Sequence, residues 1–198
     1  MRLFVALDIP DTVRQSIAAY VDEMRRISPD AKWVRFESYH VTLKFIGEWR
    51  DEVGDIIEAL QKIESEPVTL AIRGSGFFPN PKAPRVFWTG IEADQHLLPL
   101  ARKIDEACST LGIKPEDRDF SPHLTLARSG SGSPRPKKDE RSIPSMKRLA
   151  ERIAAIAPPD FGTIHATEFF LYESKLSPSG TQYTKLKSFP LVCHHDLP

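Results

Sequence analysis

The chain has 198 residues, of which 40% are apolar and 27% are charged, a balance that excludes an intrinsically disordered protein and is sufficient for one compact domain. Its 27 basic and 27 acidic residues give a formal net charge of zero, which excludes a chain that coats long nucleic acids through its overall charge. A phosphate ligand would therefore have to be held by a local site.

The sequence shows no sign of a targeting or membrane segment. The first apolar run, residues 3–9, predicts a strand, because Asp8 and Pro10 interrupt it well before a signal sequence could be completed. No other run approaches the roughly 18 apolar residues that a membrane-crossing helix requires. The two cysteines, Cys108 and Cys193, are too few for a disulfide framework and indicate reduced thiols. We therefore expect a cytoplasmic protein without a membrane anchor.

Strands and helices alternate along the chain in two rounds. The first round predicts a strand, a helix, a strand, a helix and a strand over residues 3–9, 11–27, 40–46, 53–63 and 68–72. The second round begins with a strand, a helix and a strand over residues 85–91, 97–111 and 123–127. One offset of 83 superposes Arg2 on Arg85 and His40 on His123. This common register indicates an internal duplication.

The remainder of the chain departs from the repeat. Residues 129–141 are rich in Ser, Gly, Pro and basic side chains and predict a basic loop. A helix over residues 145–156 and strands over residues 166–172 and 183–186 follow. We expect an α+β fold in a single two-lobe domain, residues 1–198, with repeat halves of roughly 1–82 and 83–198. Two antiparallel or mixed sheets, related by a pseudo-twofold axis, would form a central groove and carry the helices outside.

One short motif occurs at the same place in each round, as His40-Val41-Thr42-Leu43 and His123-Leu124-Thr125-Leu126. Side chains two positions apart in a strand share a face, so each histidine emerges beside its threonine while the intervening apolar side chains point into the core. If the halves are related by a twofold axis, the two His-Thr pairs confront each other across the groove.

Two facing imidazoles suit the chemistry of phosphate esters near neutral pH. Histidine titrates near pH 6.5, so one ring can take a proton from a nucleophile while the other gives one to a leaving oxygen. Each threonine hydroxyl can donate a hydrogen bond to a phosphate oxygen as negative charge builds up. A structural role would explain either histidine taken singly. A metal site is a further alternative, but neither strand has a second His, Cys or carboxylate at ligand spacing, so we predict no metal.

Other chemically active side chains have less context. Arg85 and Arg128 could each pair with a carboxylate at a sheet edge. No role is assigned to the remaining histidines, which are His96, His165, His194 and His195. Four aromatic residues are expected in the core rather than as platforms for a nucleobase, namely Phe45, Phe77, Phe78 and Trp88. For Trp33 and Tyr39 both interpretations stay open.

Through the two His-x-Thr segments and the residues around them, the sequence resembles the two-histidine phosphoesterase superfamily. Within that superfamily it resembles the RNA 2′,3′-cyclic phosphodiesterases once described as 2′-5′ RNA ligases. The resemblance covers nearly the whole chain. Besides the two His-x-Thr segments and their neighbours, it rests on the opening segment Arg2-Leu3-Phe4-Val5-Ala6-Leu7-Asp8, the expected turn Gly76-Phe77-Phe78-Pro79-Asn80, the segment Pro84-Arg85-Val86-Phe87-Trp88, and Leu171-Tyr172-Glu173-Ser174 with Gly180 and Tyr183 after it.

The resemblance implies a cytosolic, metal-independent enzyme that hydrolyses a terminal 2′,3′-cyclic phosphate to a 2′-phosphate. Its substrates would be RNA 3′ ends or small cyclic-phosphate nucleotides, with no cofactor, no membrane partner and a monomeric state. By resemblance, His40 would donate a proton to the leaving 3′ oxygen, and His123 would be the base that activates water. Thr42 and Thr125 would hold the phosphate, assisted by Arg128. Two alternatives stay open: ligation to 2′-5′ linkages through the same site, and a non-catalytic module that binds nucleotides or RNA ends.

Overall fold

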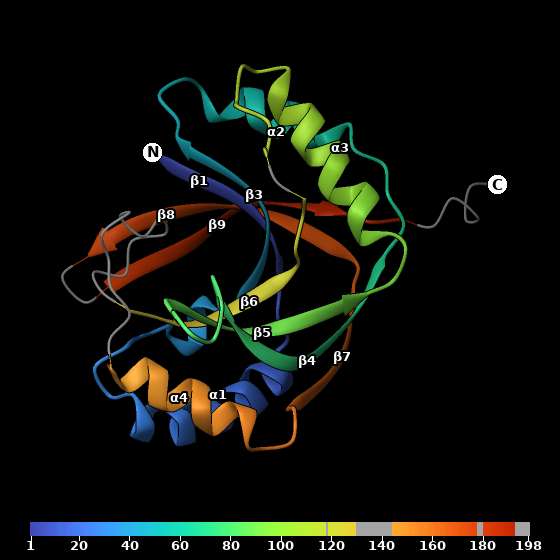
Figure 1. The fold of residues 1–198 in the computed structure, drawn as a ribbon. Helices are drawn as coiled ribbons and strands as arrows, with labels where there is room; N and C mark the ends of the chain where they lie inside the picture. The colour runs from blue at the N-terminus through green and yellow to red at the C-terminus, as the bar shows by residue number, and fades with distance from the viewer. Residues whose placement is uncertain (118, 130–143, 178–179, 193–198) are drawn as a thin grey trace.

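A computed structural model of the protein describes residues 1–117, 119–129, 144–177 and 180–192 (Figure 1). In chain order the elements are β1 (Arg2–Asp8), α1 (Asp11–Ile27), β2 (Lys32–Trp33), the 3-10 turn η1 (Phe36–Ser38), β3 (His40–Glu48), α2 (Val53–Gln61), β4 (Val68–Phe78), β5 (Val86–Ala93), α3 (Leu97–Ser109), β6 (His123–Arg128), α4 (Pro144–Ala154), β7 (Asp160–Ala166), β8 (Glu168–Ser177) and β9 (Gly180–Pro190).

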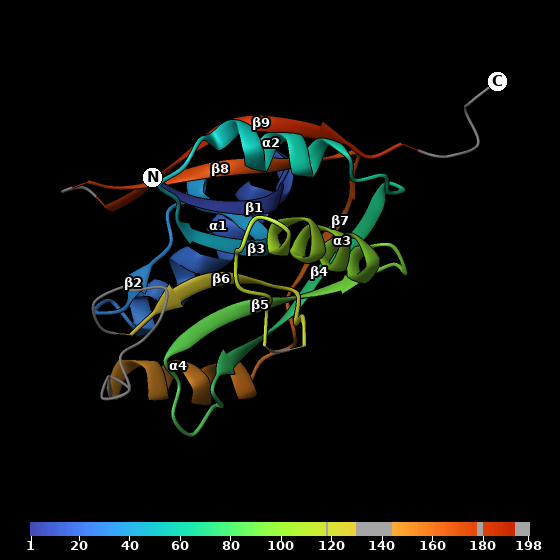
Figure 2. The same ribbon diagram turned by 90° about the horizontal axis from the view of Figure 1, so that it is seen from above.

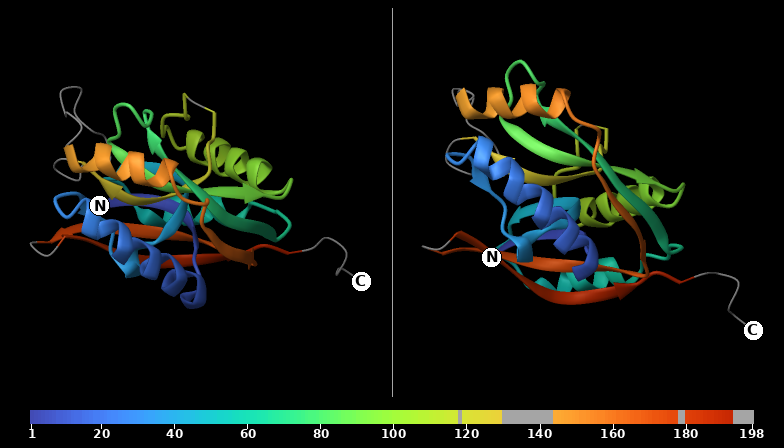
Figure 3. Two further views of the ribbon diagram at one scale, coloured as in Figure 1. Left: turned by 60° about the horizontal axis from the view of Figure 1, so that its bottom comes forward. Right: turned by 90° about the horizontal axis from the view of Figure 1, so that it is seen from below.

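The strands form two antiparallel sheets. One sheet has the strand order β3-β1-β8-β9, and the other has the order β2-β6-β5-β4-β7. Helices α1 and α4 lie side by side at one end of the molecule, while α2 and α3 lie together at the other (Figures 1 and 3). Strands β3 and β6 are neighbours where the two sheets approach each other (Figure 2). The prediction of an α+β fold with two sheets and external helices is confirmed.

Each sheet takes strands from both parts of the chain. The C-terminal strands β8 and β9 join β1 and β3, and the early strands β2 and β4 join β5, β6 and β7. The predicted repeat halves, 1–82 and 83–198, therefore do not coincide with the two sheets. In both repeats, however, the opening strand pairs with the His-x-Thr strand: β1 pairs with β3, and β5 pairs with β6.

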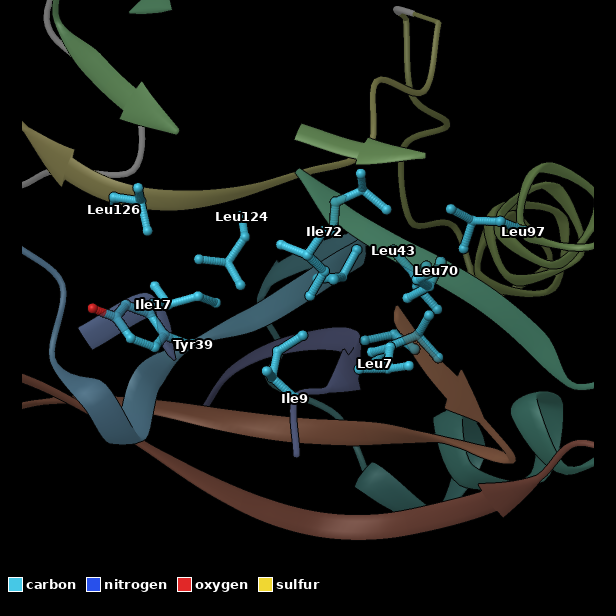
Figure 4. Packing of buried hydrophobic residues seen from close by; sticks show 14 of the residues in the cluster. Leu7, Ile9, Ile17, Tyr39, Leu43, Leu70, Ile72, Leu97, Leu124 and Leu126 are labelled. Carbon is cyan, nitrogen blue, oxygen red and sulfur yellow. The ribbon is translucent and has the colours of Figure 1, made fainter. Parts of the chain in front are cut away.

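The main core lies where the apolar faces of the two sheets and the helices meet. Leu43 of β3 and Leu124 and Leu126 of β6 point into this core, as the alternation of the His-x-Thr strands predicts (Figure 4). All three are almost fully buried, and each such leucine contributes about 1.5–3 kcal/mol relative to an exposed one. Burial of these side chains fixes which face of each strand is left for its histidine and threonine.

The turn expected at residues 76–80 begins later than predicted, because strand β4 extends to Phe78. Gly76 to Phe78 still belong to β4, and the chain turns only after them, where the Asn80 side chain accepts hydrogen bonds from the Lys82 and Ala83 amides. A Cβ on Gly76 would lie 2.4 Å from the Trp88 ring, so this glycine lets the indole lie against the strand. Strand β7 has no counterpart among the predicted elements.

Phe45 is not a core residue, contrary to the prediction, because β3 contains a β-bulge. Val5 of β1 pairs with Lys44 and Ala6 pairs with Thr42, so Leu43 has no partner and the alternation of β3 inverts after it. Lys44 consequently turns inward, 1% exposed, whereas Phe45 is 52% exposed on the same face as Thr42. Phe77, by contrast, is buried in the core as predicted.

Cys108 is a free, buried thiol, whereas Cys193 lies outside the described residues, as do residues 130–141 of the predicted basic loop. No helix in the described part of the chain has the length and apolar character needed to cross a membrane.

Candidate active site

The two histidines of the repeated motif are held in the same way. His40 and His123 each begin their strand, and the Nδ1 of each ring lies beside the carbonyl oxygen two residues earlier, at 2.7 Å for Ser38 and 2.8 Å for Ser121. A carbonyl oxygen only accepts, so each Nδ1 must carry the proton and donate it. The Nε2 atom of each neutral ring is thereby left as the base.

The two histidine strands come from different sheets but face a common region. Strands β3 and β6 contact each other, and the positive charge of Arg128 lowers the pKa of both His40 and His123. The structure therefore places the two histidine strands in contact, and the prediction that both imidazoles and Arg128 share one site stays a prediction.

Aromatic rings surround each imidazole. The ring centroid of His40 is 4.8 Å from that of Phe4, 5.1 Å from that of Tyr183 and 6.2 Å from that of Tyr172. On the other strand, the ring of His123 lies 5.0 Å from Phe78 and 6.4 Å from Trp88. Both Phe78 and Trp88 are partly exposed, so they flank the site instead of filling the core as expected.

This packing changes the protonation of the imidazoles. The pKa of His40 is lowered to about 4, mainly by burial, to which the charges of Arg14 and Arg128 add, while the Ser38 carbonyl and the Asp8 carboxylate oppose the shift. Burial is also the main cause that lowers the pKa of His123. Both rings are therefore neutral at neutral pH in the empty site, and a bound phosphate anion would favour their protonated forms.

The remaining predicted residues lie on the faces that carry the histidines. Thr42 stands opposite Ala6 and Thr125 stands opposite Trp88 in the strand pairing. The Nη2 atom of Arg128 donates a weak hydrogen bond, 3.4 Å long, to the Thr125 hydroxyl. In the described part of the chain, no carboxylate forms an ion pair with Arg128, and the alternative of a sheet-edge salt bridge stays open for this residue.

A cavity of about 240 Å³ opens beside His40, and most of its lining was not found by sequence reasoning. It is lined by Asp8, Arg14, Glu37, Tyr39, His40, Tyr172, Tyr183 and Lys185. The available signal was long-range strand pairing, because β1 brings Asp8 opposite His40 and β8 and β9 supply the two tyrosines and the lysine. A larger hollow of about 710 Å³ lies between α2 and α3 and contains none of the predicted site residues.

The described residues contain no group of three or more His, Cys, Asp or Glu side chains that could hold a metal ion. Two of the histidines without an assigned role, His194 and His195, lie outside the described residues.

Comparison with known proteins places this site in a family. The sequence profile of the family described as "LigT like Phosphoesterase" matches residues 7–88 and 90–183. The chain belongs to this family of LigT-like phosphoesterases. Its resemblance to RNA 2′,3′-cyclic phosphodiesterases, predicted from the motif flanks, is thereby confirmed.

Several relatives of this family match the chain along nearly its whole length. An RNA 2′,3′-cyclic phosphodiesterase of Archaeoglobus fulgidus is 33% identical over 190 residues, which cover 96% of this chain and 99% of that protein. One of Methanocaldococcus jannaschii is also 33% identical and covers 96% of this chain and all of the relative. The crystal structure of Escherichia coli LigT with 3′-AMP superposes with a TM-score of 0.76 at 26% identity, covering 97% and 98% of the two chains.

Proposed function

We propose that the chain hydrolyses the terminal 2′,3′-cyclic phosphate of RNA, or of small nucleotides, to a 2′-phosphate. The observation that carries the proposal is the pair of imidazoles, His40 and His123, which begin the two contacting strands β3 and β6 and are held through equivalent Nδ1 hydrogen bonds. Two bases oriented in this way can serve one phosphorus atom as a proton acceptor and a proton donor. The full-length relatives named RNA 2′,3′-cyclic phosphodiesterase support the same reaction.

In the proposed reaction, water attacks the phosphorus atom and the bond from phosphorus to the 3′ oxygen breaks. The Nε2 atom of His123 takes the proton from the attacking water, and the Nε2–H of His40 gives a proton to the leaving 3′ oxygen. One proton is accepted and one is donated, so the product carries a free 3′ hydroxyl and a 2′-phosphate. This assignment of acid and base follows the family resemblance.

The anionic substrate itself helps to prepare the acid. The burial that holds the pKa of His40 near 4 also makes this ring sensitive to a neighbouring charge. A phosphate anion entering the site offsets the loss of hydration and favours the imidazolium that the leaving oxygen requires. The hydroxyls of Thr42 and Thr125 and the guanidinium of Arg128 would hold the non-bridging oxygens as charge accumulates on them.

Solved relatives support a nucleotide as the ligand. Crystal structures of Escherichia coli LigT contain 3′-AMP, ATP or NADP⁺ and superpose on this chain over nearly its full length. A small cyclic nucleotide is therefore a suitable first substrate. Action as a monomer, a cytoplasmic location and independence from metal ions stay predictions from the sequence.

The test is to incubate the full chain with nucleoside 2′,3′-cyclic phosphates in the presence of EDTA and to identify the product isomer. The proposal requires a 2′-phosphate and full activity with the chelator. Tight binding without turnover would instead support the non-catalytic alternative. Formation of 2′-5′ linkages from RNA ends at a rate above that of hydrolysis would support the ligase.

A further inference from the structure

Arg14 is a buried arginine at the start of α1, 8% exposed, whose guanidinium is bonded on three sides. Its Nε donates to the Ile9 carbonyl at 2.6 Å, and its Nη1 donates to the Phe36 carbonyl at 3.0 Å. Its Nη2 donates to the carboxylate of Asp8. The planar fork of an arginine is suited to joining three acceptors in this way.

The bond to Phe36 links Arg14 to His40. Phe36 begins η1, and η1 ends at Ser38, whose carbonyl accepts the Nδ1–H of His40. The backbone of η1 makes a short turn of its own, through the bond from the Ser38 amide to the Arg35 carbonyl at 2.9 Å and a longer one from the Tyr39 amide to the Phe36 carbonyl at 3.4 Å. The guanidinium is thus the side-chain anchor of the turn that presents the Ser38 carbonyl.

The bond from Arg14 to Asp8 also bears on His40, because it holds a carboxylate beside the imidazole. Asp8 lies directly opposite His40 in the pairing of β1 and β3. Its carboxylate accepts hydrogen bonds from the Ile9 amide at 2.9 Å and from Lys185 at 2.5 Å, in addition to the bond from Arg14. Burial acts against the charge on Asp8, but Lys185 and Arg14 lower the pKa of this carboxyl, so the anion persists beside the imidazole.

Within the described residues, the other histidine has no equivalent support. Gly90 takes the place opposite His123 that Asp8 takes opposite His40. The repeat offset of 83 places Leu97, an apolar core residue, at the position of Arg14. Among the described residues, no side chain other than His123 itself donates a hydrogen bond to the backbone of residues 119–122. The supported histidine is the one that the family resemblance makes the proton donor.

We propose that Arg14 and Asp8 are positioning residues for His40, which hold the Ser38 carbonyl in place and thereby keep Nε2 of His40 directed at the substrate phosphate. The inference rests on the proposed function, because the phosphate is the proposed target. Misplacement of a reacting group by about 1 Å can reduce turnover on the order of 100-fold, so loss of this anchor matters even though the three side-chain hydrogen bonds of Arg14 all go to protein acceptors.

The first variant is Arg14→Ala, measured as kcat and KM with a nucleoside 2′,3′-cyclic phosphate. We expect kcat to fall about 10- to 100-fold while KM changes by less than about threefold. Millimolar guanidinium chloride, well below unfolding concentrations, should restore part of kcat, because Arg14 lines the cavity beside His40. It should restore nothing in His40→Ala. An unchanged kcat in a folded Arg14→Ala protein would overturn the proposal.

A second readout does not depend on turnover. Nitrogen-15 spectra of the imidazoles should show Nδ1 protonated in both His40 and His123 of the wild type. In Arg14→Ala the fixed tautomer of His40 should be lost, while that of His123 should persist as an internal control. If both rings keep their signals, the proposal is wrong. If the wild type shows no phosphodiesterase activity, the proposed function fails, but this spectrum still tests the link from Arg14 to His40.

The matched control is Lys44→Met, which removes another buried cation from the same strand as His40. Lys44 binds Asp105 at 2.5 Å and the Lys114 carbonyl at 2.7 Å and makes no hydrogen bond to η1. A lowered Tm with nearly unchanged kcat is the expected result. A loss of kcat as large as that of Arg14→Ala, without guanidinium rescue in either, would mean that both act only through general destabilisation, and the positioning role would be rejected.

Discussion

Phe45 of β3 and Arg128 of β6 occupy equivalent places, each three residues after the threonine of its strand and on the same face as that threonine. In a regular strand a residue three positions on would face the other way. Here Leu126 of β6 is left unpaired between Thr125 and Ala127, as Leu43 of β3 is left unpaired, so a bulge redirects both strands. The two strands therefore present different groups, an aromatic ring and a guanidinium, at equivalent positions.

Replacement of Arg128 by Met should reduce kcat/KM by about two orders of magnitude, the scale reported for loss of one donor to a transition-state oxygen. Arg128→Lys should recover only part of the activity, since a single ammonium cannot reproduce the guanidinium fork. Steady-state kinetics with a cyclic nucleotide checks both values. The control is Arg73→Met, because Arg73 is an exposed arginine that pairs with Glu92 and Asp160. This variant should leave kcat/KM nearly unchanged.

Replacement of Phe45 by Ala should raise KM for a base-containing substrate by about tenfold, because stacking on an aromatic ring is worth about 1–3 kcal/mol per base. The kcat value and the Tm should change little, since the ring is 52% exposed. Leu98→Ala removes a side chain of similar exposure from α3 and serves as the control. Equal KM values for Phe45→Ala and the wild type would show that this ring does not stack on the base.

The pH profile of kcat/KM should be displaced toward acid. This parameter reports the free enzyme, in which burial lowers the pKa of His123 and brings that of His40 to about 4. A lower pKa means a smaller protonated fraction at neutral pH, so activity that needs one imidazolium must fall as the pH rises through 7. The profile of kcat should lie at higher pH, because bound phosphate favours protonation. A kcat/KM optimum above the ordinary histidine range would contradict these shifts.

The sequence predicted most local features because they depend on local patterns. Helix α1 begins at Asp11 and ends at Ile27 as predicted, since Pro10 and the helical spacing of apolar residues define it. The repeated His-x-Thr segments likewise predicted four candidate site residues, and the face of each strand that they predicted is confirmed. Arg128 entered through the family resemblance, because strict alternation would have turned it away from Thr125.

What the sequence missed depends on pairing between distant strands. The bulges at Leu43 and Leu126 arise from the register with β1 and β5, and no residue type within either strand signals them. Tyr172 and Tyr183 reach His40 only because β8 pairs with β1, across most of the chain length. The bond between Asp8 and Arg14 spans only six residues, from the end of β1 to the start of α1, and neither the strand nor the helix pattern signals it.

The pair of imidazoles is the central claim, and single replacement of each tests it most directly. Turnover of a nucleoside 2′,3′-cyclic phosphate should be measured for His40→Ala and His123→Ala under saturating substrate, with the fold of each variant verified by circular dichroism. Each variant should lose about two to four orders of magnitude in kcat, the scale for removal of a general acid or base. A folded variant of either kind that turns over substrate at nearly the wild-type rate would contradict the two-histidine mechanism.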